Sequence, residues 1–253
     1  MTESVREESL PVQSPSLSVL PLTSQCDTLL LLCSPSIHQT GSSLQPQTYQ
    51  PIIGLLFKTY PRYVDRPSRQ AVQQCLRSLL KAPVPTDDLK YLTQKLQVEA
   101  AKPGLAPGPA LVLLEWCSVV LQILGGDPET PLSAVLDTIA VDAKALEICL
   151  ASNPRPAVKA SALRVTRRAL RAAFSSTAWG EDAVRESVRR LTSDSATGQK
   201  NAPFLGVISG VCARLPAKKP ILEGEKKAIL SFYVKELAGA RSAPPAHIAD
   251  ALG

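Results

Sequence analysis

Residues Ala110 to Leu124 read ALVLLEWCSVVLQIL, a stretch that is apolar around nearly the whole circumference of a helix. Its polar members, Glu115, Ser118 and Gln122, are spaced i, i+3 and i+7 and therefore fall in one narrow stripe. At about 1.5 Å per residue the stretch is roughly 22 Å long, short of the ~30 Å hydrocarbon core of a bilayer, and it carries a charge near its middle. We therefore expect a core helix, wet along one stripe and packed by helices on both flanks, and not a membrane span.

The composition of the 253-residue chain favours helices. Hydrophobic residues make up 45% of it, enough to bury a core, whereas aromatic residues make up only 4%. Sheets favour aromatic and β-branched residues, and no run of alternating apolar and polar residues is long enough for a convincing strand. The predicted fold class is all-α.

Apolar residues recur at helical spacing along most of the chain after residue 48. Besides 110–124, the expected helices span 51–60, 69–81, 86–100, 131–150, 156–174, 181–191, 203–215 and 221–237, and a last helix begins near Ile248. The polar segment 192–202, TSDSATGQKNA, is predicted to be a flexible loop. Gly206, Gly210 and Ala213 are predicted to form a small-residue stripe that lets another helix approach closely.

Helix pairs recur about every 40 residues, a period typical of HEAT and armadillo repeats. We therefore predict a HEAT/armadillo-like α-solenoid of about five helix pairs over residues 49–253. Its carboxyl end is expected to be open and uncapped, as in a fragment or an incorrectly assigned gene. Residues 1–48, rich in Ser, Pro and Gln, are predicted to be a mostly disordered segment, and they open without the basic region of a secretory signal.

The residues that usually carry chemistry are scattered. The six cysteines contain no C-x-x-C pair and the two histidines, His38 and His247, lie far apart, so no zinc site is expected. Most of the cysteines lie on apolar helix faces, where a thiol behaves as a small hydrophobe, and a reducing compartment is the simple interpretation. Neither a phosphate-binding loop nor a G-x-S-x-G serine is present in the sequence. We expect a protein that is not an enzyme, with no cofactor, no metal and no small-molecule substrate.

Positive charge is concentrated in one part of the chain. Of the net charge of +6, residues 155–219 hold thirteen Lys or Arg against four acids. On a helical wheel of 156–174 the arginines form a ridge opposite an apolar front, and a second set follows on 181–191. The candidate phosphate-contacting residues are Arg164, Arg167, Arg168, Arg171, Arg185, Arg189 and Arg190. If the two sets align, they form a guanidinium strip suited to phosphates. The alternative is that these arginines lie on ordinary solvated helix faces and bind nothing.

Three strings in the chain carry a resemblance to a known family. They are GLLFKTYPRYVDRPSRQAV (54–72), LLEWCSVVL (113–121) and NAPFLGVISGVCARL (201–215). They resemble the amino-terminal region of the fungal HEAT-repeat translational activators of general amino-acid control, the stalled-ribosome sensors known as general control nonderepressible scaffolds. The resemblance covers roughly residues 50–253.

The resemblance implies a cytoplasmic scaffold that binds translating or collided ribosomes, through rRNA or ribosomal protein, and helps to activate the kinase of an initiation factor. Family members continue for many more repeats, including regions that meet an ABC-type ATPase and the kinase. This sequence lacks both regions, so those translation-control partners are expected to bind elsewhere.

Two other functions are consistent with the same pattern. The first is a generic HEAT-repeat adaptor of the transport-receptor or phosphatase-scaffold type, which binds peptides in its concave groove instead of phosphate on a ridge. The second is a regulatory piece of an enzyme encoded elsewhere. None of the three involves a membrane.

Overall fold

The computed structural model describes residues 49–62, 65–80, 86–126, 129–152, 155–193, 195–216 and 223–239. Within these ranges the chain forms nine α-helices and one short 3-10 helix, and no strand, which confirms the all-α prediction. The elements are α3 (Tyr49–Thr59), η3 (Tyr60–Arg62), α4 (Arg66–Leu79), α5 (Thr86–Ala100), α6 (Pro107–Leu124), α7 (Leu132–Ser152), α8 (Pro156–Phe174), α9 (Gly180–Ser193), α10 (Ser195–Cys212) and α11 (Glu223–Gly239). The predictions for residues 1–48 and for a helix near Ile248 lie outside the described residues.

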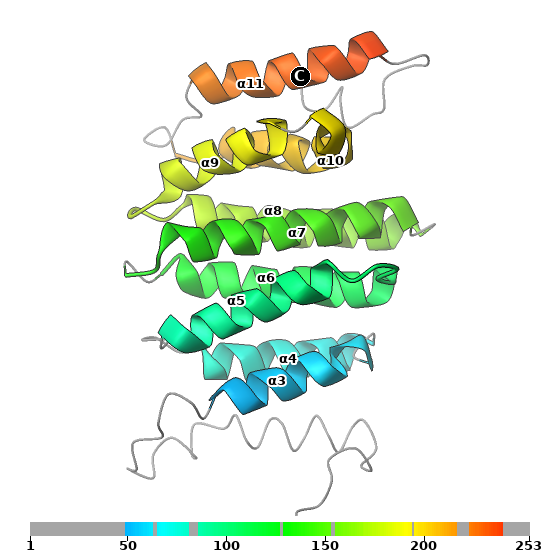
Figure 1. The fold of residues 1–253 in the computed structure, drawn as a ribbon, viewed down its shortest axis with the longest axis vertical. Coiled ribbons are helices and arrows are strands. Elements are labelled where there is room, and N and C mark those ends of the chain that lie inside the picture. Colours follow the sequence, from blue (N-terminus) through cyan, green and yellow to red (C-terminus); the bar gives the residue numbers. More distant parts are fainter. Residues whose placement is uncertain are drawn as a thin grey trace, which may run out of the picture.

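The helices are stacked in two layers (Figure 1). The odd layer contains α3, α5, α7, α9 and α11, and each of these helices packs on the next member of the layer. The even layer contains α4, α6, α8 and α10, which pack on one another in the same order. Contacts between α6 and α7, α7 and α8, and α9 and α10 join the layers. Consecutive helices therefore alternate between the two layers along the chain.

Helix α6 is the core helix that its sequence predicts. It lies between α4 and α8 in its own layer and packs on α7 across the layers. Among the described helices it is the one long and apolar enough to cross a membrane, but two thirds of it, 67%, is buried inside the protein. The indole of Trp116 lies against Phe57 and Tyr60, with ring centroids 4.9 and 5.7 Å apart. A helix that is apolar on nearly all sides is stable in water only when neighbouring helices cover it.

The polar stripe of α6 is more covered than expected. Ser118 is buried and accepts a hydrogen bond from Gln122, while Glu115 is covered by α4. Two side chains of α4, Arg69 and Gln73, donate hydrogen bonds to the Glu115 carboxylate. The stripe is thus a polar contact between two helices of the even layer rather than a wet surface.

Helix starts follow local capping. The Asp65 carboxylate accepts a hydrogen bond from the backbone N–H of Ser68 at 2.9 Å, so α4 begins three residues before the expected start. Pro107 and Pro156 occupy the first position of α6 and α8, where a missing N–H costs nothing. For α8 the expected range and the observed one are identical.

Helix α10 corrects two predictions. Residues 195–202 were expected in a loop but are helical, and Pro203 lies inside the helix. An internal proline removes one backbone hydrogen bond, and here the helix continues on both sides of it. Gly210 and Ala213 are exposed, and a Cβ on Gly210 would meet no atom within 4 Å, so this part of the small-residue stripe faces solvent.

A close helix approach occurs at Gly125, at the end of α6. A Cβ on Gly125 would lie 2.9 Å from the carbonyl oxygen of Ala172 in α8. The absence of a side chain at this position lets the end of α6 reach the backbone of α8.

Candidate functional site

Four arginines of α8 form an exposed row, which we call the α8 ridge: Arg164, Arg167, Arg168 and Arg171. Their spacing places them on one side of the helix. The opposite side is buried in the core through Ala162, Thr166, Ala169, Leu170, Ala173 and Phe174. Because α8 packs on α6, α7, α9 and α10, its exposed side faces away from the odd layer.

The α8 ridge keeps its positive charge. Helix α8 contains no Asp or Glu, so its arginines have no acidic partner on their own helix. Among the described residues, none of the four guanidinium groups takes part in an ion pair. Each is therefore available to an anion from outside the domain.

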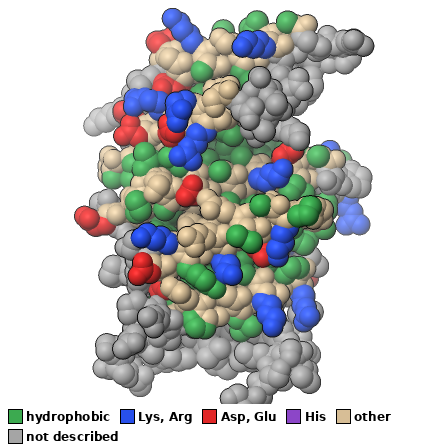
Figure 2. Space-filling view, in the orientation of Figure 1, with side chains coloured by type: hydrophobic (Ala, Val, Ile, Leu, Met, Phe, Trp, Pro, Cys, Tyr) green, Lys and Arg blue, Asp and Glu red, His purple; other side chains and the backbone are tan. Residues whose placement is uncertain are grey.

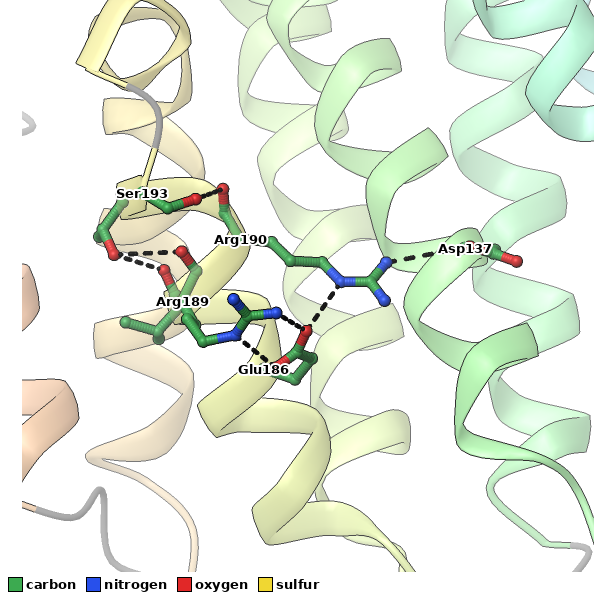
Figure 3. A network of polar contacts seen from close by, with 7 residues as sticks. Asp137, Glu186, Arg189, Arg190 and Ser193 are labelled. Carbon is green, nitrogen blue, oxygen red and sulfur yellow. Dashed lines mark hydrogen bonds and ion pairs between the residues drawn. The ribbon is translucent and has the colours of Figure 1, made fainter.

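The three arginines of α9 have a different environment, and Figure 3 shows two of them, Arg189 and Arg190. Arg189 and Arg190 both donate to the carboxylate of Glu186 on the same helix, with Nε···O distances of 2.7 and 3.1 Å. Arg185 pairs with Asp182 at 2.9 Å. The hydrogen bonds from Arg189, and then those from Arg190, lower the pKa of Glu186 to about 2.

The α9 arginines also connect helices of the odd layer. Arg190 reaches Asp137 of α7 at 4.0 Å, and Arg185 reaches Glu225 of α11 at 3.3 Å. The face formed by the odd layer accordingly shows Lys and Arg side chains next to Asp and Glu around α9 (Figure 2). The structure therefore does not bring the two arginine sets into one strip, because α8 and α9 belong to different layers.

The sequence contains the signal that separates the two sets. On α9, acids precede the arginines by three or four residues, which is the spacing of ion pairs within a helix. On α8, every position three or four residues from an arginine is uncharged or basic.

A buried carboxyl group, Asp142 of α7, was not anticipated. It is completely inaccessible and faces the hydroxyl of Thr166 on α8, without a hydrogen bond of ordinary length between them. Burial raises its pKa to about 8. The thiols of Cys117 and Cys149 lie close enough for the carboxylate charge to raise their pKa values further, after burial.

These buried groups offer little chemistry. The free thiols of Cys117, Cys149 and Cys212 are buried, and burial raises the pKa of each. A thiol with a raised pKa is a poor nucleophile at neutral pH, because little thiolate is present. Cys75 of α4 is buried but disulfide-bonded, which a reducing compartment does not predict. In the part of the chain that the structure describes, no three His, Cys, Asp or Glu side chains form a group that could hold a metal ion.

No family model, no curated protein and no solved structure matches this chain. The described residues define an all-helical domain.

Proposed function

We propose that this chain is a non-catalytic, cytoplasmic scaffold built as a HEAT/armadillo-like α-solenoid. The alternation of helices between two layers supports this architecture, since each two-helix repeat of a solenoid packs only on the neighbouring repeats. The odd-layer helices begin at Tyr49, Thr86, Leu132, Gly180 and Glu223. These starts are spaced close to the ~40–47 residues of HEAT and armadillo units.

The scaffold's proposed partner is the ribosome, and the α8 ridge is the proposed contact. The observation that carries this proposal is that four exposed arginines on one helix face have no acidic partner among the described residues. Arginine matches the geometry of phosphate and binds it without sequence recognition. The one aromatic residue of α8, Phe174, is buried, so the ridge offers no base-stacking platform.

The resemblance to translational activators of general amino-acid control supports the physiological part of the proposal. In this role the scaffold helps to activate the initiation-factor kinase when ribosomes stall under amino-acid starvation. Contacts with the kinase and with other translation-control proteins would be made by regions that this sequence does not contain.

Sedimentation with purified ribosomes across a salt series tests the proposal. We expect the full chain to pellet with ribosomes at low salt and to be released as salt rises. Four arginine–phosphate contacts set a slope of log affinity against log salt of roughly −3 to −4. A chain that stays in the supernatant at low salt, or whose pelleting does not depend on salt, would contradict it. Salt-independent capture of apolar peptides would support the peptide-binding adaptor instead.

A further inference from the structure

The last turn of α9 combines an exposed hydroxyl with two arginines. Residues 189–193 read RRLTS, which places Arg190 three residues and Arg189 four residues before Ser193. Ser193 is the final residue of the helix and is exposed. Figure 3 shows its side chain at the end of α9, on the same turn as Arg189 and Arg190.

The Ser193 hydroxyl is held only weakly. Its Oγ donates one hydrogen bond, to the backbone oxygen of Arg190 at 3.2 Å. The neighbouring Thr192 is only partly exposed, and its hydroxyl donates a shorter bond, 2.8 Å, to the oxygen of Val188. Terminal turns of helices open most readily, so Ser193 can enter another protein's active site with little loss of structure.

We propose that Ser193 is a phosphorylation site for a protein kinase that recognises arginine on the amino-terminal side of its acceptor. The Ser193 Oγ attacks the γ-phosphorus of ATP, and the bond from that phosphorus to the bridging oxygen of ADP breaks. The hydroxyl proton passes to the kinase's catalytic base, and ADP leaves. Arg190 and Arg189 supply the positive charge that an acidic kinase groove selects.

The modification would change the ion pairs of α9. A phosphate carries a charge of about −1.5 to −2, and arginine is its preferred partner. Residues three and four positions apart face each other on a helix, so phosphorylated Ser193 competes with Glu186 for Arg190 and Arg189. The competition withdraws Arg190 from Asp137, which is a link between α9 and α7. A dianion at the carboxyl end of a helix also opposes the helix dipole, so the last turn loosens.

Treatment of the full chain with ATP and an arginine-directed kinase, followed by peptide mapping by mass spectrometry, tests the assignment. We expect phosphate on Ser193, with loss of label from the peptide that contains this position in Ser193→Ala and at least tenfold slower labelling of Ser193 in Arg190→Gln. Ser175 provides a matched control, because it is also exposed at the end of a helix and its Oγ donates to the oxygen of Arg171 at 2.6 Å. It has Ala172 three residues before it, so Ser175→Ala should leave labelling unchanged.

Phosphate on Thr192 or Ser175, or undiminished labelling of Ser193→Ala, would overturn the assignment. So would an unlabelled folded chain under conditions in which a peptide of residues 186–196 is labelled. Hydrogen exchange tests the consequence, since the amides of the last turn of α9 should exchange at least severalfold faster in the phosphorylated chain. Equal exchange rates would remove the proposed effect on α9.

Discussion

The Arg69 side chain of α4 donates hydrogen bonds to both carboxylate oxygens of Glu115 on α6, with Nε···O distances of 3.2 and 3.1 Å. Gln73, one turn further along α4, donates to the same carboxylate at 2.8 Å. The side chains of Arg69 and Glu115 are only 18% and 14% exposed, so this pair is shielded from solvent and salt. It is the polar link between the first two helices of the even layer.

Glu115→Ala should destabilise the domain by about 1.5–3 kcal/mol, because it removes a largely buried ion pair and the hydrogen bonds that Arg69 and Gln73 donate to this carboxylate. Urea unfolding followed by circular dichroism measures the change. Glu147→Ala is the control, since Glu147 pairs with a half-exposed Lys144 at 3.4 Å and should cost less than about 1 kcal/mol. Equal losses in the two variants would contradict a special role for the Arg69–Glu115 pair.

Trp116→Ala should cost about 3–5 kcal/mol, the range for removing a large buried aromatic side chain. Trp116 is 1% exposed and its ring packs edge-on against Phe57, which connects α6 to the first helix of the odd layer. Chemical denaturation of the purified variant checks the value. A loss below about 1 kcal/mol would indicate that α6 is not the packed core helix described above.

Asp142 should make the domain less stable as pH rises. Its pKa is about 8 in the folded chain against an ordinary value of 3.8, so the folded state holds a proton that the unfolded chain releases between these values. The stabilising contribution is complete below pH 3.8 and is lost as pH rises through 8. The side chains that face it are Thr166 of α8, Cys117 of α6 and Cys149 of α7.

Asp142→Asn removes the titration and should flatten the decline of melting temperature between pH 5 and 8 relative to the wild type. The variant should also be the more stable protein at pH 8, where the wild-type carboxyl is half ionised in a buried site. Melting curves at fixed ionic strength provide the measurement. If both proteins lose the same stability across this range, Asp142 is not the group responsible.

The sequence predicts apolar packing in this chain better than charge pairing. Helix α8 is predicted to the residue because Pro156 fixes its start and an apolar period defines its buried side. On the expected helix 51–60, the spacing of Ile53, Leu56 and Phe57 likewise predicts the side of α3 that is buried. The spacing of apolar residues indicates which side of a helix is buried, and this is a local property of the sequence.

Three features depended on information that a local pattern does not hold. The start of α10 differs from the prediction because Pro203, a residue typical of helix boundaries, lies inside the helix. The bond between Arg69 and Glu115 joins residues on different helices, so neither helix alone predicts it. The two arginine sets lie on helices of opposite layers, and this placement follows only from the stacking, whereas the pairing of the α9 arginines with acids follows from their local spacing.

The contrast between α8 and α9 provides the most direct test of the proposed ribosome contact. Ribosome co-sedimentation at moderate salt should be measured for two variants that retain the wild-type helical circular dichroism signal. The first replaces the α8 ridge, Arg164, Arg167, Arg168 and Arg171, with Gln, and the second replaces Arg185, Arg189 and Arg190 with Gln. We predict that the first variant loses at least tenfold in ribosome affinity while the second pellets like the wild type. Undiminished pelleting of the α8 variant, or an equal loss in both, would contradict the assignment of the contact to the α8 ridge.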